Sequence, residues 1–208
     1  MVIINSTILS GAGAIPSLTS LLPDIRKMLL VTDRNIAQLD GVQQIRALLE
    51  KHCPQVNVID NVPAEPTHHD VRQLMDALGD ASFDVVVGIG GGSVLDVAKL
   101  LSVLCHPQSP GLDALLAGEK PTQRVQSWLI PTTGSEATPN AILAIPEQST
   151  KVGIISQVLL PDYVALFPEL TTSMPAHIAA STGIDALCHL LECFTATVAN
   201  PVSDNAAL

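Results

Sequence analysis

The sequence predicts an α/β fold, in which helices cover both faces of a parallel β-sheet. Three observations lead to this class: short apolar runs alternate with stretches of helical periodicity, one of those runs leads through four glycines into a helical pattern, and 47% of the 208 residues are hydrophobic. Strands and helices that alternate in this way favour parallel strands joined by right-handed crossovers. The length is enough for one large domain or two small ones.

Three strand–helix units make up the first half of the chain. The expected strands are the apolar runs at residues 27–33, 55–60 and 83–90. The expected helices follow at residues 41–52 and 69–80 and from Ser93 onward. The first of these helices places Val42, Ile45, Leu48 and Leu49 on one face, which is the spacing of a helix packed against a sheet.

The second half begins with a fourth expected strand at residues 127–133 and changes character near residue 161. The proline-rich stretch that follows marks a boundary, and residues 175–196 then have a helical pattern that we expect to bend or break near Gly183. We therefore divide the chain into an α/β domain at residues 1–165 and the beginning of an all-α domain at residues 166–208, which we expect to be truncated.

The composition excludes several classes of partner. Twenty acidic residues against ten basic ones give a net charge of −10, and the basic residues form no cluster, so neither nucleic acid nor an anionic membrane surface is an expected partner. No apolar run reaches the roughly 18 residues that span a bilayer, and no secretory signal is visible. We therefore expect a cytoplasmic protein whose four cysteines are free, buried thiols.

The stretch "GIGGGSVLDVAKLL", residues 88–101, has the order strand, glycine loop and helix, which is an arrangement that binds phosphate groups. Glycines let an anion approach the backbone, and the N-terminus of the helix adds unsatisfied N–H groups. Ser93 stands where an N-cap belongs, and Asp96 follows at the spacing of a capping box. Because Ser93 also replaces the third glycine of the Rossmann fingerprint, the alternative of a tight turn with no ligand stays open.

Asp33 stands at the carboxyl end of the first expected strand. A carboxylate at this position can accept hydrogen bonds from a ribose 2′-hydroxyl. The same residue can equally be a helix cap or a turn former, because it is followed by Arg34 and Asn35. Arg34 adds a third alternative, since an arginine beside this position favours a 2′-phosphate.

Asp185 and His189 are four residues apart, so a helix places both side chains on one face. A carboxylate and an imidazole placed in this way can reach one divalent cation. A solvated or hydrogen-bonded pair is the alternative. Their apolar neighbours, such as Ile184 and Leu190, predict that both groups are partly buried, and buried ionisable groups need a partner.

Seven stretches together resemble the iron-containing (group III) alcohol dehydrogenase family. They are "GAGAI", "VTD" ending at Asp33, "PAEPT" at residues 63–67, "GIGGGSVLDVAK", "IPTTGSEAT", "LLPDYVALFPELTTSMP" and "STGIDALCHLLECFTA", and they follow the family order across nearly the whole chain. The resemblance implies a dehydroquinate synthase-like fold, with a dinucleotide-binding α/β domain, an all-helical domain and the site in the cleft between them.

The resemblance also assigns roles to individual residues. It implies that Asp33 contacts the adenine-side ribose and that the pyrophosphate lies on Gly91, Gly92 and Ser93. It implies that the nicotinamide side is lined by Thr132, Thr133 and Lys151. Asp185 and His189 are implied as two of four metal ligands, with Fe(II), or sometimes Zn(II), as the metal. NAD is the expected cofactor, and NADP is the alternative.

Two departures from the family pattern bear on these roles. The family usually reads Pro-Thr-Thr-Ala-Gly-Thr-Gly-Ser-Glu where this chain reads "PTTGSEATP", so the loop after Thr133 is three residues shorter. The two further histidine ligands of the family lie beyond the region that this chain matches. His189 is followed by only nineteen residues and no histidine, so the metal site is half a site.

The resulting hypothesis is a metal-dependent alcohol dehydrogenase that transfers a hydride between an alcohol or aldehyde and a nicotinamide cofactor, with activity impaired by truncation. An oxidoreductase of the maleylacetate reductase or glycerol dehydrogenase type is one alternative, and a non-catalytic nucleotide-binding remnant is another. Maleylacetate reductase tends to lack the metal, so the presence of Asp185 and His189 argues against that enzyme. The identity of the alcohol and the formation of a homo-oligomer stay open.

Overall fold

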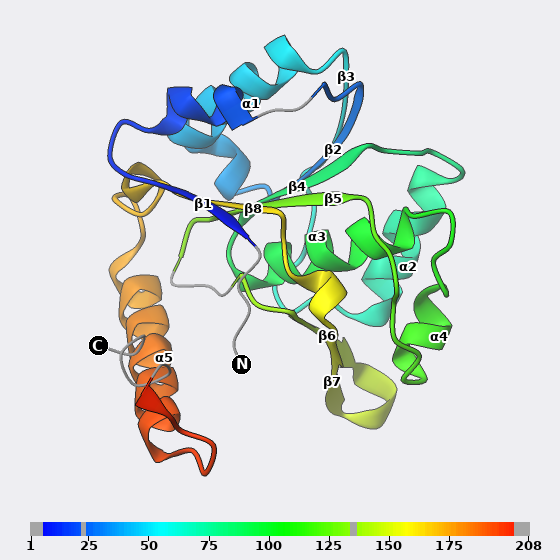
Figure 1. Cartoon of the computed structure of the whole chain (residues 1–208), viewed down its shortest axis with the longest axis vertical. Coiled ribbons are helices and arrows are strands. Elements are labelled where there is room, and N and C mark those ends of the chain that lie inside the picture. The colour runs from blue at the N-terminus through cyan, green and yellow to red at the C-terminus, as the bar shows by residue number, and fades with distance from the viewer. Residues whose placement is uncertain (1–5, 22–23, 134–136, 202–208) are drawn as a thin grey trace.

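A computed structural model describes residues 6–21, 24–133 and 137–201 of the chain. Six strands form one sheet in the order β1-β8-β5-β4-β2-β3, and every neighbouring pair is parallel (Figure 1). In this order the strands are Thr7–Ser10, Tyr163–Leu166, Gln126–Pro131, Val85–Gly90, Lys27–Val31 and Gln55–Ile59. The predicted α/β class with a parallel sheet is confirmed.

Helices cover both faces of this sheet (Figure 1). One face is covered by α1 (Asp40–His52) and the 3-10 helix η1 (Ile15–Leu21), and the other by α2 (His68–Leu78), α3 (Gly92–Leu104) and α4 (Leu112–Leu116). Side chains of β2 alternate between the two cores, with Leu29 on the α3 side and Leu30 on the α1 side. Both faces are therefore apolar, as a parallel sheet requires.

Two of the predicted helices begin and end for clear local reasons. At the start of α2, the Thr67 hydroxyl accepts a hydrogen bond from the backbone of Asp70, and the Asp70 carboxylate accepts one from the backbone of Thr67. This capping box fixes the first turn, and Gly79 ends the helix with a positive φ of 54°. Helix α1 buries three of the four residues that the spacing placed on one face, Val42, Ile45 and Leu49, and Leu48 is partly buried against the same core.

The start of α3 differs from the prediction. Gly91 is the N-cap residue, with extended backbone angles, and Ser93 already lies inside the helix. The capping box expected from Ser93 and Asp96 is therefore wrong. Pairing of β4 with β5 continues to Gly90, so the helix must begin directly after it. The Asp96 carboxylate instead lies 2.8 Å from Lys99 Nζ and accepts a hydrogen bond from Ile142 N.

An antiparallel hairpin, β6 (Asn140–Ile145) and β7 (Thr150–Ile155), packs beside α3 and was not predicted. The 3-10 turn η3 (Pro146–Gln148) joins its strands. Lys99 anchors it: the ammonium group is buried within α3 and donates hydrogen bonds to the carbonyl oxygens of Thr138 and Asn140. A buried cation that is paired and hydrogen-bonded in this way fixes the hairpin to the domain.

The proline-rich stretch after residue 161 is not a linker. Its first part forms β8, which pairs with β5 on one side and β1 on the other, and so lies inside the sheet. The short helix η5 (Pro168–Leu170) follows and buries Leu170 against the α1 side. The division of the chain at residue 165 stays a prediction.

Helix α5 (Ala176–Thr195) extends from this region to one side of the domain (Figure 1). It is one continuous helix, so the break expected near Gly183 is absent, and the Cβ of an alanine there would meet no atom within 4 Å. No residue of α5 is buried. Among the described residues, no helix has both the length and the apolar character needed to cross a bilayer.

Candidate functional site

The sheet order creates the site. From β2 the chain continues to β3 on one side, whereas from β4 it continues to β5 on the other, so the connections diverge between β2 and β4. In open α/β sheets, ligands bind beyond the carboxyl ends of the strands at such a switch point. The segments after β2, β4 and β5 contain Asp33, the glycine loop and Thr132, and they meet at this edge.

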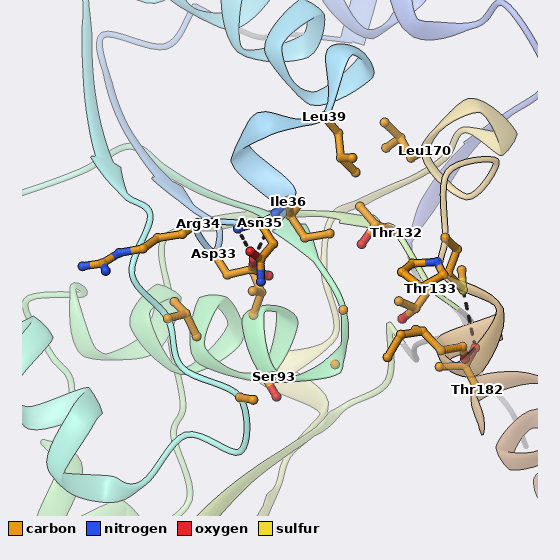
Figure 2. A pocket seen from close by; sticks show the side chains of 18 of the residues that line it. Asp33, Arg34, Asn35, Ile36, Leu39, Ser93, Thr132, Thr133, Leu170 and Thr182 are labelled. Carbon is orange, nitrogen blue, oxygen red and sulfur yellow. Dashed lines mark hydrogen bonds between the residues drawn. The ribbon is translucent and has the colours of Figure 1, made fainter. Parts of the chain in front are cut away.

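A pocket of about 1100 Å³ lies here (Figure 2). Its lining residues are Asp33–Ile36 and Leu39 after β2, Asn61–Ala64 after β3, Gly91–Val94 at the start of α3, Thr132 and Thr133 after β5, and Leu170, Ser173–Pro175, His177, Ile178 and Thr182. The volume exceeds that of an ordinary small-molecule pocket, as an extended ligand requires. Six of the seven residues implied in cofactor binding therefore line one cavity.

The glycines before α3 let the helix approach β4 closely. A Cβ atom at Gly88 would lie 2.6 Å from Ala98 Cβ, and one at Gly90 would lie 2.6 Å from Val94 Cβ. Gly91 and Gly92 then carry the backbone along the pocket wall without side chains. No side-chain hydrogen bond caps α3 at its N-cap residue Gly91, so the amides of its first turn and the positive end of its dipole suit an anion.

Ser93 faces the segment between β3 and α2. Its hydroxyl oxygen accepts a hydrogen bond of 3.2 Å from the backbone N–H of Glu65. Glu65 has a positive φ of 52°, which a non-glycine residue adopts only where its surroundings hold it. Ser93 therefore fixes the loop that forms the opposite wall of the pocket, in addition to lining it.

Asp33 makes local hydrogen bonds. Its Oδ1 atom accepts from the backbone N–H groups of Asn35, at 2.8 Å, and Ile36, at 2.9 Å. Figure 2 shows both bonds, and it shows Arg34 extending away from Thr132 and Thr133. The structure thus contains the turn that the sequence allowed as an alternative, and the carboxylate still lines the pocket.

Thr132 and Thr133 follow β5 on the same wall (Figure 2). The Thr132 backbone N–H donates to Gly90 O at 3.0 Å, which ties this loop to the glycine loop. The Thr132 hydroxyl is buried and has no hydrogen-bond partner within the described part of the chain. A polar ligand would satisfy such a group. The shortened loop continues into residues 134–136, which lie outside the described residues.

Lys151 is the implied cofactor residue that the structure does not bring to the pocket. It lies on β7, and its Nζ is 3.1 Å from Glu65 Oε1. Both side chains are exposed, so this ion pair adds little stability. The ion pair does join the β6–β7 hairpin to the segment around Glu65, whose backbone also donates to Ser93.

Asp185 and His189 lie on α5, beyond the turns that line the pocket. His189 Nδ1 is 3.9 Å from Asp185 Oδ2, so the two groups are on one face, as the spacing predicted. Their side chains are 68% and 45% exposed, so the expected partial burial is wrong for this chain. In the described part of the chain, these residues belong to no group of three ligand-type side chains.

One wall of the pocket was missed by reasoning from the sequence. It is formed by the segment from Leu170 to Pro175 and by the first turns of α5, where Met174 accepts a hydrogen bond of 3.8 Å from the Thr182 hydroxyl (Figure 2). The only available signal was the stretch "LFPELTTSMP", which carried the family resemblance and gave no residue role.

The parallel sheet, the glycine loop at a helix N-terminus and the cavity at the switch point define a dinucleotide-binding type of α/β domain. The sequence profile described as iron-containing alcohol dehydrogenase matches residues 5–168. The chain belongs to the iron-containing alcohol dehydrogenase family.

Individual proteins give the same result. The chain is 34% identical to long-chain-alcohol dehydrogenase 1 of Geobacillus thermodenitrificans over 95% of its own length and 52% of the relative's. It is 37% identical to 4-hydroxybutyrate dehydrogenase of Cupriavidus necator, over 88% of this chain and 49% of that protein. It therefore spans about half the length of the curated relatives it matches.

Solved structures share the fold. An iron-containing alcohol dehydrogenase from Thermotoga maritima matches with a TM-score of 0.89 and 29% identity, covering 100% of this chain and 58% of that one. Sulfoacetaldehyde reductase from Bifidobacterium kashiwanohense, solved in complex with NAD+, matches with a TM-score of 0.86 and 23% identity, covering 100% of this chain and 56% of that one. The predicted dehydroquinate synthase-like fold class is confirmed.

Proposed function

We propose that the pocket binds NAD and that the chain is the dinucleotide-binding portion of a metal-dependent alcohol dehydrogenase. The observation that carries this proposal is the convergence of Asp33, the uncapped N-terminus of α3 and the unpartnered Thr132 hydroxyl on one cavity. A turn without a ligand would explain the glycines, but it would not explain a buried hydroxyl left without a partner beside them.

Each group in the pocket has a role in this proposal. The amides after Gly91, together with Gly92 and Ser93, hold the pyrophosphate, because they supply N–H donors at the positive end of the α3 dipole. Asp33 accepts hydrogen bonds from the adenine-side ribose through its second carboxylate oxygen. Thr132 and Thr133 orient the nicotinamide end.

Asp33 also favours NAD over NADP in this proposal. A carboxylate at this position repels a 2′-phosphate, and Arg34, which also lines the cavity, extends away from Thr132 and Thr133 (Figure 2). The protein solved with NAD+ that shares this fold makes NAD+ the first cofactor to test. Lys151 is left without a direct role in this chain, because it pairs with Glu65 outside the pocket.

Asp185 and His189 would supply two ligands of the metal site. A carboxylate and an imidazole suit Fe(II) or Zn(II), and their 3.9 Å separation lets both reach one ion. When bound, the metal acts as a Lewis acid on the oxygen of the alcohol. The reaction would be hydride transfer between an alcohol or aldehyde and the nicotinamide, which the pocket residues orient.

We infer little or no alcohol dehydrogenase activity for the 208-residue chain on its own. Catalytic metal sites of this kind use at least three protein ligands, whereas the described residues bring together two. A chain that binds NAD but has no activity at all would be the non-catalytic nucleotide-binding remnant that the sequence allowed as an alternative. Exposed apolar side chains on α5 further favour self-association, which would make the chain a homo-oligomer or poorly soluble.

The experiment is an assay of the purified chain, loaded with Fe(II) or Zn(II), with simple alcohols and NAD+. Asp185→Asn is the matched control. Turnover below the detection limit in both proteins, with NAD+ binding intact, is expected. Turnover in the wild-type chain within about tenfold of the ~10 s⁻¹ typical of enzymes would contradict the inferred loss of activity.

A further inference from the structure

A second cluster of metal-ligand side chains lies outside the pocket. His68 and His69 are the first two residues of α2, and Glu147 lies in the turn η3 at the tip of the hairpin. The fold brings these distant segments together through a β-bridge between Thr67 and Ala144. The backbone N–H of Ala144 also donates to Pro66 O at 3.0 Å.

Both imidazoles direct the same nitrogen at one carboxylate. His69 Nε2 is hydrogen-bonded to Glu147 Oε1, and His68 Nε2 lies 3.8 Å from Glu147 Oε2. The two rings lie beside each other, with centroids 3.9 Å apart. One ligand atom from each of the three residues falls within 4.8 Å of the others. Three donors at this spacing can surround one ion.

His68 is the independent sign of a missing ligand. Its side chain is only 13% exposed. Its Nδ1 atom is buried without a hydrogen-bond partner among the described residues, and the 3.8 Å from Nε2 to Glu147 is too long for a hydrogen bond. A buried ring nitrogen left without a hydrogen-bond partner is destabilising unless a further group binds it.

The chemistry of the three donor atoms determines which kind of ion they can bind. Two imidazole nitrogens and one carboxylate oxygen suit a divalent transition metal, and sites of this composition keep open positions for water. His69 and Glu147 are exposed, so the ion has a path from solvent.

We propose that His68, His69 and Glu147 bind a divalent transition-metal ion, with Zn(II) as the representative, that ties the start of α2 to the β6–β7 hairpin. This site is separate from Asp185 and His189, which lie on α5. The ion also stabilises the segment of residues 61–67, which leads directly into α2 and whose first half lines the pocket. Its role is structural.

Zinc titration by calorimetry tests the proposal. The chain is prepared without a histidine tag and carries Asp185→Asn, His189→Ala, Cys188→Ser and Cys193→Ser, so that the ligands on α5 do not contribute. We expect one Zn(II) per chain. Partners that merely orient a ligand already contribute about tenfold or more to affinity, so His68→Ala and His69→Ala should each weaken binding by at least about tenfold.

His52→Ala is the matched control, because this exposed histidine is hydrogen-bonded to Leu48 O of its own helix, and it should leave the affinity unchanged. Thermal unfolding is the second readout: Zn(II) should raise Tm in the background chain and not in Glu147→Gln, which keeps the shape of that side chain. Equal zinc affinity in the background chain and in all three ligand variants would overturn the proposal, and so would the absence of binding in the background chain. Because the α5 ligands are removed, neither result bears on the proposed dehydrogenase function.

Discussion

Helices α3 and α5 are both rich in apolar residues, yet their environments are opposite. Ten of the 13 residues of α3 are buried, because the helix packs between the sheet and the hairpin. None of the 20 residues of α5 is buried, and its apolar side chains at Ile184, Leu187, Leu190, Leu191 and Phe194 are exposed. The difference shows that apolar periodicity predicts a helix, whereas burial depends on what else is available to cover it.

This contrast separates the two parts of the candidate site. The pocket is built on strands and on α3, whose positions the core fixes from both sides. Asp185 and His189 lie on α5, none of whose residues is buried. We therefore expect the dinucleotide site to be formed in this chain, and the metal pair to need further contacts before it can bind an ion tightly.

The largest expected effect compares one leucine from each helix. Leu100→Ala removes a fully buried side chain of α3 and should cost about 2–5 kcal/mol of unfolding free energy, because it leaves a cavity. Leu187→Ala on exposed α5 should change stability by less than about 0.5 kcal/mol. Urea denaturation of both variants measures the difference. Equal losses would mean that α5 is packed in solution.

Glycine substitutions sharpen the same comparison. Gly88→Ala places a Cβ atom 2.6 Å from Ala98 Cβ and should cost about 1–3 kcal/mol through overpacking. Gly183→Ala meets no atom and should raise helix stability by up to about 1 kcal/mol. Denaturation curves followed by circular dichroism test both values. A destabilised Gly183→Ala variant would indicate a close partner for α5.

Cys105, at the end of α3, should make stability depend on pH. Burial raises the pKa of its thiol from 9.0 to about 11. Between these values the unfolded chain loses the proton and the folded chain keeps it, so stability falls as pH rises, by about 2 kcal/mol in total. The unfolding free energies of Cys105→Ala and the wild type are compared from about pH 8 to 11, a range that contains both pKa values of the thiol. The difference between the two curves isolates this loss of stability.

Cys188→Ala, on the exposed helix α5, is the control for that series and should follow the wild-type curve. A Cys105→Ala curve that falls as steeply as the wild type between pH 9 and 11, about the range over which the shift acts, would contradict the assignment of the slope to this thiol.

The smallest expected effect concerns cofactor choice. Asp33→Asn keeps an oxygen that can accept from Asn35 and Ile36 while removing the charge, so the turn should survive. The preference for NAD over NADP should narrow by about fivefold to tenfold, since one repulsive charge is removed. Titrations with both dinucleotides measure it. A wild-type chain that binds NADP more tightly would contradict the assigned role of Asp33.

The sequence predicted best those elements whose structure is determined by their own local sequence. Apolar runs on both sides of the glycine motif predicted β4 and α3, and the apolar side chains of α3, such as Val94, Leu95 and Leu101, are buried. Strand β8 was missed because it is short and lies between prolines. The hairpin was missed because its burial depends on Lys99 and α3, which lie far from it in sequence.

Part of the lining of the pocket could also be predicted from the sequence. Sequence motifs identified Asp33, the glycines and Thr132, which the fold places around one cavity. They did not indicate that Ser93 would hold Glu65 instead of capping α3, because the start of that helix is set by the pairing of β4. They also did not indicate that His68 and His69 would meet Glu147, since that contact depends on the unpredicted hairpin.

Calorimetric titration of the 208-residue chain with NAD+, with and without Fe(II), is the decisive test of the proposed dinucleotide site. We expect binding that does not depend on Fe(II) and that falls on the order of a hundredfold in Gly91→Val, because a side chain there occupies the place of the pyrophosphate. Gly91 has a φ of −80°, so valine adds no backbone strain. Absent NAD+ binding in a folded wild-type chain, or unchanged affinity in Gly91→Val, would contradict the proposed site.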